Sequence, residues 1–203
     1  MAIHLVKEYF DGEVKELEAE VYRDDRGFFQ ESFRSDQLAA VGVNAEFKQD
    51  NHSGSVKNVL RGLHFQFEPA LGKLMRVTRG AAFLVAVDIR KYSPTLGQSV
   101  GVLASAENAK MLWAPAYFAR GFYSMSEFAE IQYKCTGIYN PKTERAIHWQ
   151  DPLLQIDWPS EVTTSTPITS EKDANANSLE SWLESPESDA FVYTQKRRAV
   201  VAG

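Results

Sequence analysis

The sequence predicts an all-β fold, a sandwich or jelly roll of short strands with small helices at its periphery. Short runs of strand-forming residues alternate with turn residues, and no long helical pattern precedes residue 169. Roughly ten such runs fall within about 140 residues, which is typical of antiparallel sandwiches and barrels. A parallel α/β sheet would instead need helical crossovers between its strands.

The predicted strands follow one another with turn signals between them. Residues 24–27 (Asp-Asp-Arg-Gly) separate the first two, and residues 93–97 separate two later ones. A short helix is expected over residues 35–41, ending at Gly42. The strands are expected at residues 14–22, 28–33, 47–52, 59–67, 74–78, 82–88, 98–103, 110–113, 121–124 and 129–135.

The chain changes character toward its C-terminal end. Residues 160–169 are rich in Ser, Thr and Pro and predict a connecting loop. Ser170 and Asp173 are spaced as in a capping box, which predicts a helix start. Apolar residues at 179, 182 and 183 supply the packing face of a C-terminal helix. We predict one domain over residues 1–185 and a tail over 186–203, with the basic residues 196–198 in solvent.

Composition limits the possible functions. The 203 residues are 44% hydrophobic and 12% aromatic, which suffices for one packed domain. A formal net charge of −5 disfavours nucleic-acid binding. The single cysteine, Cys135, excludes an internal disulfide and fits a reducing cytoplasm. No signal peptide pattern is present, and no apolar run approaches the roughly 18 residues of a membrane span. We therefore expect a cytoplasmic protein that does not bind a membrane.

Several reaction types lack their usual motifs. His4, His52, His64 and His148 show no spacing typical of metal ligands, so no metal is predicted. No glycine-rich dinucleotide loop, phosphate loop or G-x-S-x-G motif occurs, and no cofactor is predicted. Cys135 lies in no sequence motif of a catalytic nucleophile, which disfavours covalent catalysis. Acid–base catalysis is the reaction type that these observations leave open.

The segment Asn58-Val-Leu-Arg-Gly-Leu-His-Phe-Gln66 carries the strongest chemical signal. Arg61 and His64 are three residues apart in a predicted strand, so they would face opposite sides unless a bulge intervenes. A histidine held on a rigid strand suits proton transfer. Taken alone, the segment favours a buried histidine that is satisfied by hydrogen bonds.

A series of motifs continues in one order from about residue 5 to about residue 185. It includes Leu60-Arg-Gly-Leu-His-Phe-Gln66, Gly72-Lys-Leu-Met-Arg-Val77, Val85-Ala-Val-Asp-Ile-Arg90, Gln132-Tyr-Lys-Cys-Thr136 and Ser170-Glu-Lys-Asp173. In this order the motifs resemble the dTDP-4-dehydrorhamnose 3,5-epimerase family. The resemblance implies a cupin-like jelly roll, a homodimer, and catalysis without metal or cofactor.

The resemblance also implies a reaction. The family acts on a nucleotide-linked, dTDP-type 4-keto-6-deoxyhexose, in which the ketone acidifies the protons on C3 and C5. His64 matches the base, and Asp173 matches the carboxylate that orients it. Lys73 matches the cation near the enolate oxygen, and Tyr133 matches the proton donor on the opposite face. Without the resemblance, the local sequence favours an ordinary surface lysine at a strand start for Lys73, and it allows an ordinary strand tyrosine for Tyr133.

Further residues match substrate contacts of the family. Arg61 matches a pyrophosphate contact, with Gln49 and Asn51 in the same pocket. Arg120 and Tyr139 fall in other pocket motifs. The residues that a partner subunit lends to the nucleotide site are matched by Arg26, Phe29 and Glu31.

The chain departs from the family pattern at several positions. Arg120 replaces a pocket histidine, Tyr117 replaces a glycine, Leu84 stands where aspartate is common, and Ile138 replaces a tyrosine before Tyr139. The changes at 84 and 120 would make the pocket about two charges more positive. We hypothesise that they retune the sugar bound or the carbon inverted. The alternatives are an epimerase for one carbon, an enzyme for a different nucleotide or 4-keto sugar, and a non-catalytic sugar-nucleotide binding protein.

Overall fold

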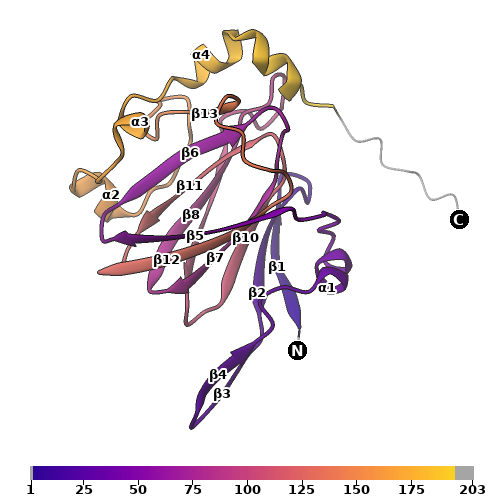
Figure 1. The fold of residues 1–203 in the computed structure, drawn as a ribbon. Coiled ribbons are helices and arrows are strands. Elements are labelled where there is room, and N and C mark those ends of the chain that lie inside the picture. The colour runs from indigo at the N-terminus through magenta and orange to yellow at the C-terminus, as the bar shows by residue number, and fades with distance from the viewer. Residues whose placement is uncertain (1, 195–203) are drawn as a thin grey trace, which may run out of the picture.

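The computed structural model describes residues 2–194 as two antiparallel sheets packed face to face (Figure 1). One sheet has six strands in the order β1-β2-β10-β7-β12-β5, and the other has five in the order β13-β6-β11-β8-β9. The six-stranded sheet comprises β1 (Ile3–Tyr9), β2 (Val14–Ala19), β10 (Lys110–Ala114), β7 (Lys73–Arg79), β12 (Phe128–Cys135) and β5 (Gln49–Val56). The five-stranded sheet comprises β13 (Glu144–Ala146), β6 (Leu60–Gln66), β11 (Phe118–Ser124), β8 (Ala81–Asp88) and β9 (Ser99–Ser105).

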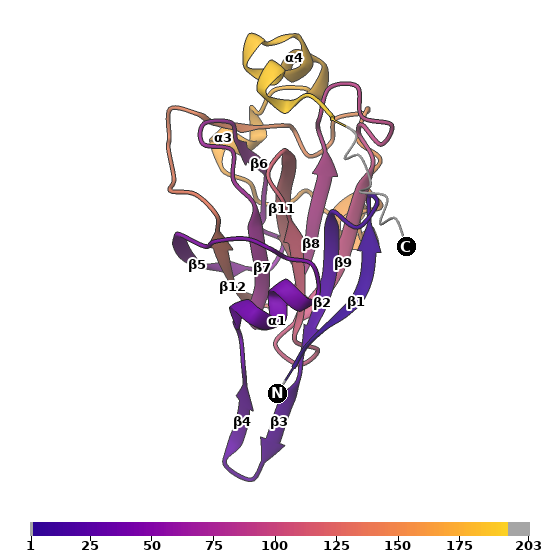
Figure 2. The ribbon, with the colours of Figure 1, turned by 90° about the vertical axis from the view of Figure 1, so that its right-hand side faces the viewer.

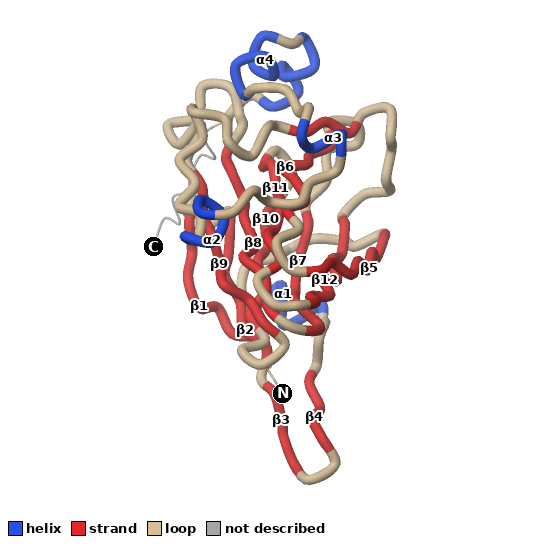
Figure 3. Tube along the Cα trace, turned by 90° about the vertical axis from the view of Figure 1, so that its left-hand side faces the viewer, coloured by secondary structure: helices blue, strands red, loops and turns tan. Residues whose placement is uncertain are grey.

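A two-stranded hairpin, β3 (Val21–Asp24) and β4 (Gly27–Gln30), projects away from the sandwich (Figures 1 and 2). We call these residues, 21–30, the arm. The helices lie at the edges and on the outer faces (Figure 3). They are α1 (Ser35–Ala40), α2 (Ser160–Thr164), α3 (Glu171–Ala174), α4 (Leu179–Glu184) and the 3-10 helix η1 (Pro186–Phe191).

Strand β8 shows how the layers are built. Leu84 and Ala86 face the core between the two sheets, while Val85 and Val87 belong to a second core on the outer side. All four side chains are fully buried. Because both faces of β8 are covered, its sequence is a continuous apolar run instead of an alternating one.

The C-terminal segment supplies that outer cover. Leu179, Trp182 and Phe191 join the outer core of the five-stranded sheet, and the Trp182 ring lies 4.5 Å from that of Phe65 on β6. The carboxylate of Asp151 accepts a hydrogen bond from the Leu179 N–H and so satisfies the start of α4. The elements after residue 169 are thereby fastened to the sheet that carries His64.

The predicted all-β sandwich with peripheral helices is confirmed, with local differences. The predicted strand over residues 14–22 is divided between β2 and β3. Strands β1 and β13 were not predicted. Most side chains of β1 are exposed because it is an edge strand, and β13 is only three residues long, so neither shows an apolar alternation.

The C-terminal elements differ in part from expectation. The predicted helix start is confirmed, since the Ser170 hydroxyl accepts a hydrogen bond from the Asp173 N–H, but the Asp173 carboxylate bonds to His64 and Gly62 instead of completing the capping box. The loop predicted over residues 160–169 is wrong at its start, where α2 forms and buries Val162. Residues 186–191, predicted as tail, form η1 and bury Phe191 completely. A single apolar residue in a short 3-10 helix produces no periodic signal. Residues 196–198 lie outside the described range.

The packing of Phe191 predicts a large effect of its removal. Phe191→Ala should lower the free energy of unfolding by about 3–5 kcal/mol, because it empties a ring-sized space in the outer core. Urea unfolding measures this change. The neighbouring, more exposed Val192 provides the control, and Val192→Ala should change it by less than about 1 kcal/mol. Equal effects at 191 and 192 would contradict the packing described.

Candidate active site

A bulge in β6 turns two of its polar side chains to the same side. In the pairing with β11, His64 lies opposite Arg120, and Arg61 lies opposite Phe122. Three steps along β6 therefore match two steps along β11, which adds one residue to β6. Arg61 and His64 consequently both reach the space between the sheets. Without the bulge, residues three apart on a strand would face opposite sides.

Glycines make this bulge possible. Gly62 has φ +136°, a backbone conformation that other residues rarely adopt. A Cβ on Gly62 would lie 2.7 Å from the Cα of Gly121, and a Cβ on Gly121 would lie 2.7 Å from the Arg61 carbonyl oxygen. The two strands therefore approach too closely here for any side chain.

The space between the sheets contains a cavity of about 350 Å³. Strands of both sheets contribute to its walls, which combine polar and apolar side chains. It is lined by Gln49, Asn51, Ser53, Arg61, His64, Phe65, Gln66, Leu71, Lys73, Met75, Arg120, Gly121, Phe122, Tyr133, Cys135, Tyr139 and Glu144.

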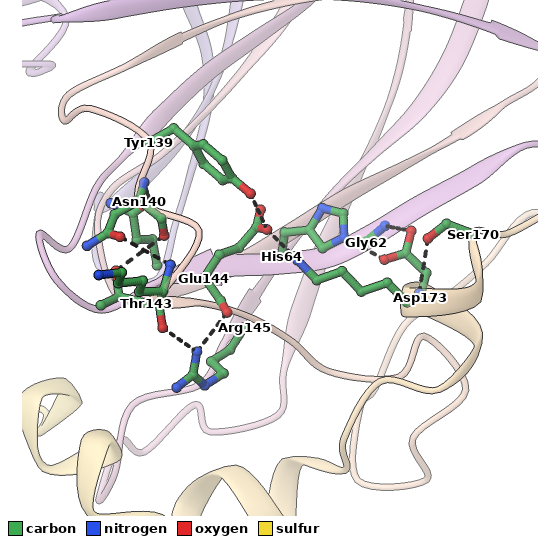
Figure 4. A network of polar contacts seen from close by, with 12 residues as sticks. Gly62, His64, Tyr139, Asn140, Thr143, Glu144, Arg145, Ser170 and Asp173 are labelled. Carbon is green, nitrogen blue, oxygen red and sulfur yellow. Dashed lines mark hydrogen bonds and ion pairs between the residues drawn. The ribbon is translucent and has the colours of Figure 1, made fainter.

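His64 and Asp173 form a close pair at this cavity. The Nε2 atom of His64 lies 2.6 Å from the Oδ1 atom of Asp173, although 109 residues separate them in the chain. Figure 4 shows His64 between Asp173, from α3, and Glu144, from β13. Asp173 is only 3% exposed, and its other oxygen accepts the Gly62 N–H at 3.4 Å. Helix α3 thus holds the carboxylate, and β6 holds the imidazole.

The pair determines which nitrogen of His64 can act as a base. Burial opposes ionisation of Asp173, but hydrogen bonds from His64 and the Gly62 N–H outweigh it and lower the pKa of the carboxyl group. An ionised carboxylate can only accept a hydrogen bond, so the neutral imidazole carries its proton on Nε2. Its Nδ1 lone pair is then the one left for proton transfer.

Tyr133 and Lys73 occupy the opposite sheet. They lie on the adjacent strands β12 and β7, and the Lys73 Nζ atom is 4.8 Å from the centre of the Tyr133 ring. Burial raises the pKa of Tyr133, although a hydrogen bond with Asn51 acts the other way. The phenol is therefore protonated at neutral pH and can donate. Burial and the nearby charge of Arg120 lower the pKa of Lys73 to about 8, so most of it remains cationic at neutral pH.

A ring of hydrogen-bonded polar groups completes the lining. Gln49 donates to the Asn51 side chain at 2.9 Å and accepts from the Tyr139 N–H at 2.8 Å. The Arg61 guanidinium donates to Ser55 and to the Gly54 carbonyl. These bonds orient donors and acceptors on the cavity wall before any ligand arrives.

Comparisons with known proteins identify this arrangement. The family model of dTDP-4-dehydrorhamnose 3,5-epimerase matches residues 12–181. The chain belongs to this family. The enzyme of that name from Pseudomonas aeruginosa is 52% identical over 158 residues, which cover 77% of this chain and 86% of the relative. The one from Salmonella typhimurium is 51% identical over 169 residues, which cover 82% and 91%.

A solved structure is similar throughout. A dTDP-6-deoxy-D-glucose-3,5-epimerase from Legionella pneumophila, in complex with dTDP-4-keto-L-rhamnose, superposes with a TM-score of 0.85. It is 42% identical, and the match covers 95% of this chain and 99% of that one. The cupin-like sandwich expected from the resemblance is therefore the fold of this epimerase-family chain.

Glu144 is a cavity residue that the sequence did not single out. Its carboxylate accepts a hydrogen bond from the Tyr139 hydroxyl at 3.1 Å and pairs with Lys172 (Figure 4). Burial opposes its ionisation, but the contact with Lys172 prevails and lowers the pKa of Glu144. Since Lys172 precedes Asp173 in α3, the ion pair also ties that helix to β13. The three-residue strand β13 gave no signal in the sequence.

The departures from the family pattern do not gather in the cavity. Arg120 lines it, but Leu84 is buried in the core between the sheets and Tyr117 packs against Phe191 on the outer side. Ile138 is more than half exposed. The expected gain of two positive charges in the pocket is therefore wrong for residue 84, because Leu84 packs in the core and does not line the cavity. Only Arg120 changes the cavity itself.

Three predicted nucleotide contacts lie outside this cavity. Arg26, at the tip of the arm, has a side chain that is 90% exposed and pairs with Asp24. Phe29 is 59% exposed, and Glu31, just after the arm, lies 3.7 Å from Arg34. No residue of the arm lines the cavity, and the arm projects away from the sandwich (Figures 1 and 2).

Within residues 2–194, no group of three or more His, Cys, Asp or Glu side chains is placed to hold a metal. No helix there combines the length and apolar character needed to cross a bilayer. Cys135 lies near Lys73 and Arg120, whose charges favour a thiolate, but burial prevails and raises the pKa of its thiol. A protonated thiol is a poor nucleophile.

The buried Asp173 predicts an acid-sensitive contribution to stability. Its pKa is lower in the folded chain, so the unfolded chain takes up the proton first as the pH falls below about 4. The free energy of unfolding should therefore decrease toward acid, by up to about 1.4 kcal/mol per pH unit for this group. In Asp173→Asn this part of the slope should be absent. Urea unfolding between pH 5 and about 3 measures it.

The exposed Asp25 in the arm serves as the control, because Asp25→Asn removes a carboxylate from solvent instead of from the core. Its slope should match that of the unaltered protein. An unchanged slope in Asp173→Asn would mean that the buried pair does not bind protons as described.

Proposed function

We propose that the protein is an isomerase, a dTDP-4-dehydrorhamnose 3,5-epimerase that acts on a dTDP-linked 4-keto-6-deoxyhexose. The observation that carries this proposal is the position of His64 and Tyr133 on facing sheets across one cavity. Inversion of a carbon requires a base on one face of the sugar ring and an acid on the other. The names of the close relatives support the same substrate.

The first step is removal of a proton from carbon. The Nδ1 atom of His64 takes the proton from C3 or C5, each of which is adjacent to the C4 ketone. The imidazolium that forms donates from Nε2 to Asp173, whose carboxylate is already held by Gly62 and α3. Because the carboxylate is ionised before the reaction, the new positive charge is stabilised without rearrangement.

The second requirement is stabilisation of the enolate. Deprotonation moves negative charge to the C4 oxygen, and Lys73 supplies a buried cation on the facing sheet. Lys73 is a stronger electrostatic partner there than in water because the cavity wall excludes solvent. Tyr133 then returns a proton from the other face, and its raised pKa keeps that proton in place until the enolate forms.

The nucleotide part of the substrate needs contacts farther out. Arg61, Gln49, Asn51 and Tyr139 present donors and acceptors at the cavity, and Arg61 suits a pyrophosphate. The exposed arm supplies no contact to its own cavity. We assign Arg26, Phe29 and Glu31 to the site of a second copy, which makes the active protein a homodimer with exchanged arms.

A second candidate is an epimerase that inverts one carbon only. Arg120 favours this candidate, because a buried arginine changes the charge of the cavity. Inversion of both C3 and C5 requires the sugar ring to present each carbon in turn to that cavity. The two candidates share the base, the cation and the acid, and they differ in the fate of C3 and C5.

The decisive experiment follows hydrogen exchange. With dTDP-4-keto-6-deoxyglucose in deuterated water, the protein should introduce deuterium at both C3 and C5 and invert both carbons, as resolved by NMR. Exchange at a single carbon would favour the second candidate, and binding of dTDP without exchange would contradict both.

Replacement of the base tests its assignment. His64→Asn should lower exchange at both carbons by about 10³-fold or more while dTDP affinity is retained. His52→Asn is the matched control, because His52 lies on β5 beside the cavity residue Asn51 but its side chain is half exposed and pairs with Glu130. Full exchange in His64→Asn would disprove the role of His64. Tyr133→Phe should permit exchange without inversion.

Exchange of arms between subunits can be tested by mixing two inactive proteins. His64→Asn lacks the base, and an Arg26→Ala, Phe29→Ala double variant lacks the lent residues. In a mixed dimer one site has both defects and the other has neither, so equal mixing should restore about a quarter of full activity. Mixing His64→Asn with Asp173→Asn, which alter the same site, should restore none. Equal results in both mixtures would contradict the assignment.

A further inference from the structure

Arg120 occupies an unusual position at the inner wall of the cavity. It lies on β11 opposite His64 of β6, and it is 2% exposed. Both of its terminal nitrogens donate to the carbonyl oxygen of Leu71 at 2.8 Å. Its Nε atom is buried and has no hydrogen-bond partner among residues 2–194. The single Leu71 carbonyl therefore accepts from only two of the five N–H donors of this guanidinium.

The Leu71 carbonyl belongs to the turn that leads into Lys73. Gly72, between them, donates its N–H to the Thr136 hydroxyl at 2.8 Å, and a Cβ on Gly72 would lie 2.7 Å from the Trp113 ring. The turn is therefore fixed by Thr136, just after β12, on one side and by Arg120 on the other. Through this bidentate contact, β11, which pairs with the strand that carries the base, also holds the start of the strand that carries the cation.

The charge of Arg120 is not neutralised by its surroundings. Within residues 2–194, no ion pair involves Arg120 or Lys73, and Glu144, the one carboxylate of the cavity lining, is engaged by Lys172 and Tyr139. The ionisable groups that line the cavity with Lys73 are Arg61 and His64 of β6, Arg120 of β11, Tyr133 and Cys135 of β12, Tyr139, and Glu144 of β13. Two cations thus share the inner part of the cavity without a carboxylate of their own.

We propose that Arg120 is a positioning residue for Lys73, which it holds in place through the Leu71 carbonyl. Its positive charge also favours the negative charge that develops on a substrate in the cavity. The inference rests on the proposed function, in which that charge is the enolate. The side chain of Arg120 is buried and each of its terminal nitrogens donates to Leu71, which favours a role through Lys73 over direct binding of phosphate. The lowered pKa of Lys73, which burial and then Arg120 cause, agrees with this role.

Two kinds of substitution separate the two parts of the role. Arg120→Gln removes the charge, and Arg120→His provides a second variant that is neutral above pH 8. Arg120→Lys keeps the charge but cannot donate two parallel hydrogen bonds to the Leu71 carbonyl. Arg76→Gln is the matched control, because Arg76 lies three residues after Lys73 on β7 and bonds to Gln132 instead of lining the cavity.

The first measurement uses the full chain without substrate. Acetylation of Lys73 by acetic anhydride, followed by peptide mass spectrometry across pH, reports the pKa of its amine. The midpoint should lie near pH 8 in the unaltered protein. It should rise by about one unit in Arg120→Gln and Arg120→His, and by less than about 0.3 unit in Arg120→Lys and Arg76→Gln. An unchanged midpoint in both neutral variants would overturn the electrostatic part of the proposal.

The second measurement is turnover. Arg120→Lys should reduce kcat about tenfold or more while KM stays within about threefold, since a misplaced Lys73 weakens the transition state more than binding. Unchanged kcat in Arg120→Lys would overturn the positioning part, as would a loss carried by KM alone. If the unaltered protein shows no epimerisation, the proposed function fails, whereas the acetylation midpoints still decide whether Arg120 governs Lys73.

Discussion

The close approach of β6 and β11 at two glycines is the constraint on which the site depends. Without a side chain at Gly62 or Gly121, the strands can pass near enough for β6 to take up one extra residue. That residue restores Arg61 and His64 to a common face. In a regular strand, one of the two would point into the outer core, where the C-terminal helices pack.

The two-sheet architecture then supplies what a single strand cannot. His64 comes from the five-stranded sheet, while Lys73 and Tyr133 come from the six-stranded one, so a ring between them meets different groups on its two faces. Burial shifts the pKa values of Tyr133 and Lys73 in opposite directions. It keeps the phenol of Tyr133 protonated and makes the ammonium of Lys73 more acidic.

The C-terminal segment has a part in the chemistry as well as in packing. The apolar contacts of α4 and η1 fasten the segment to the outer face of the five-stranded sheet, and the Ser170 cap orients the start of α3. The pair between Lys172 and Glu144 adds a polar tie beside the cavity. Together these contacts place Asp173 within hydrogen-bond distance of an imidazole that is remote in sequence, and local hydrogen bonds alone could not do so.

By itself, the sequence determined the antiparallel sandwich, most of its strands, the cap of α3 and the apolar face of α4, because alternation, turn residues and capping depend on neighbours in the chain. With the family motifs it also indicated His64, Asp173, Lys73 and Tyr133. Only the tertiary structure decided that these four meet at one cavity, that Glu144 joins them, and that Leu84 and Tyr117 stay outside. The reason is that the direction of a side chain in a sheet depends on register and bulges, and its ionisation depends on burial, which pairing between distant strands creates.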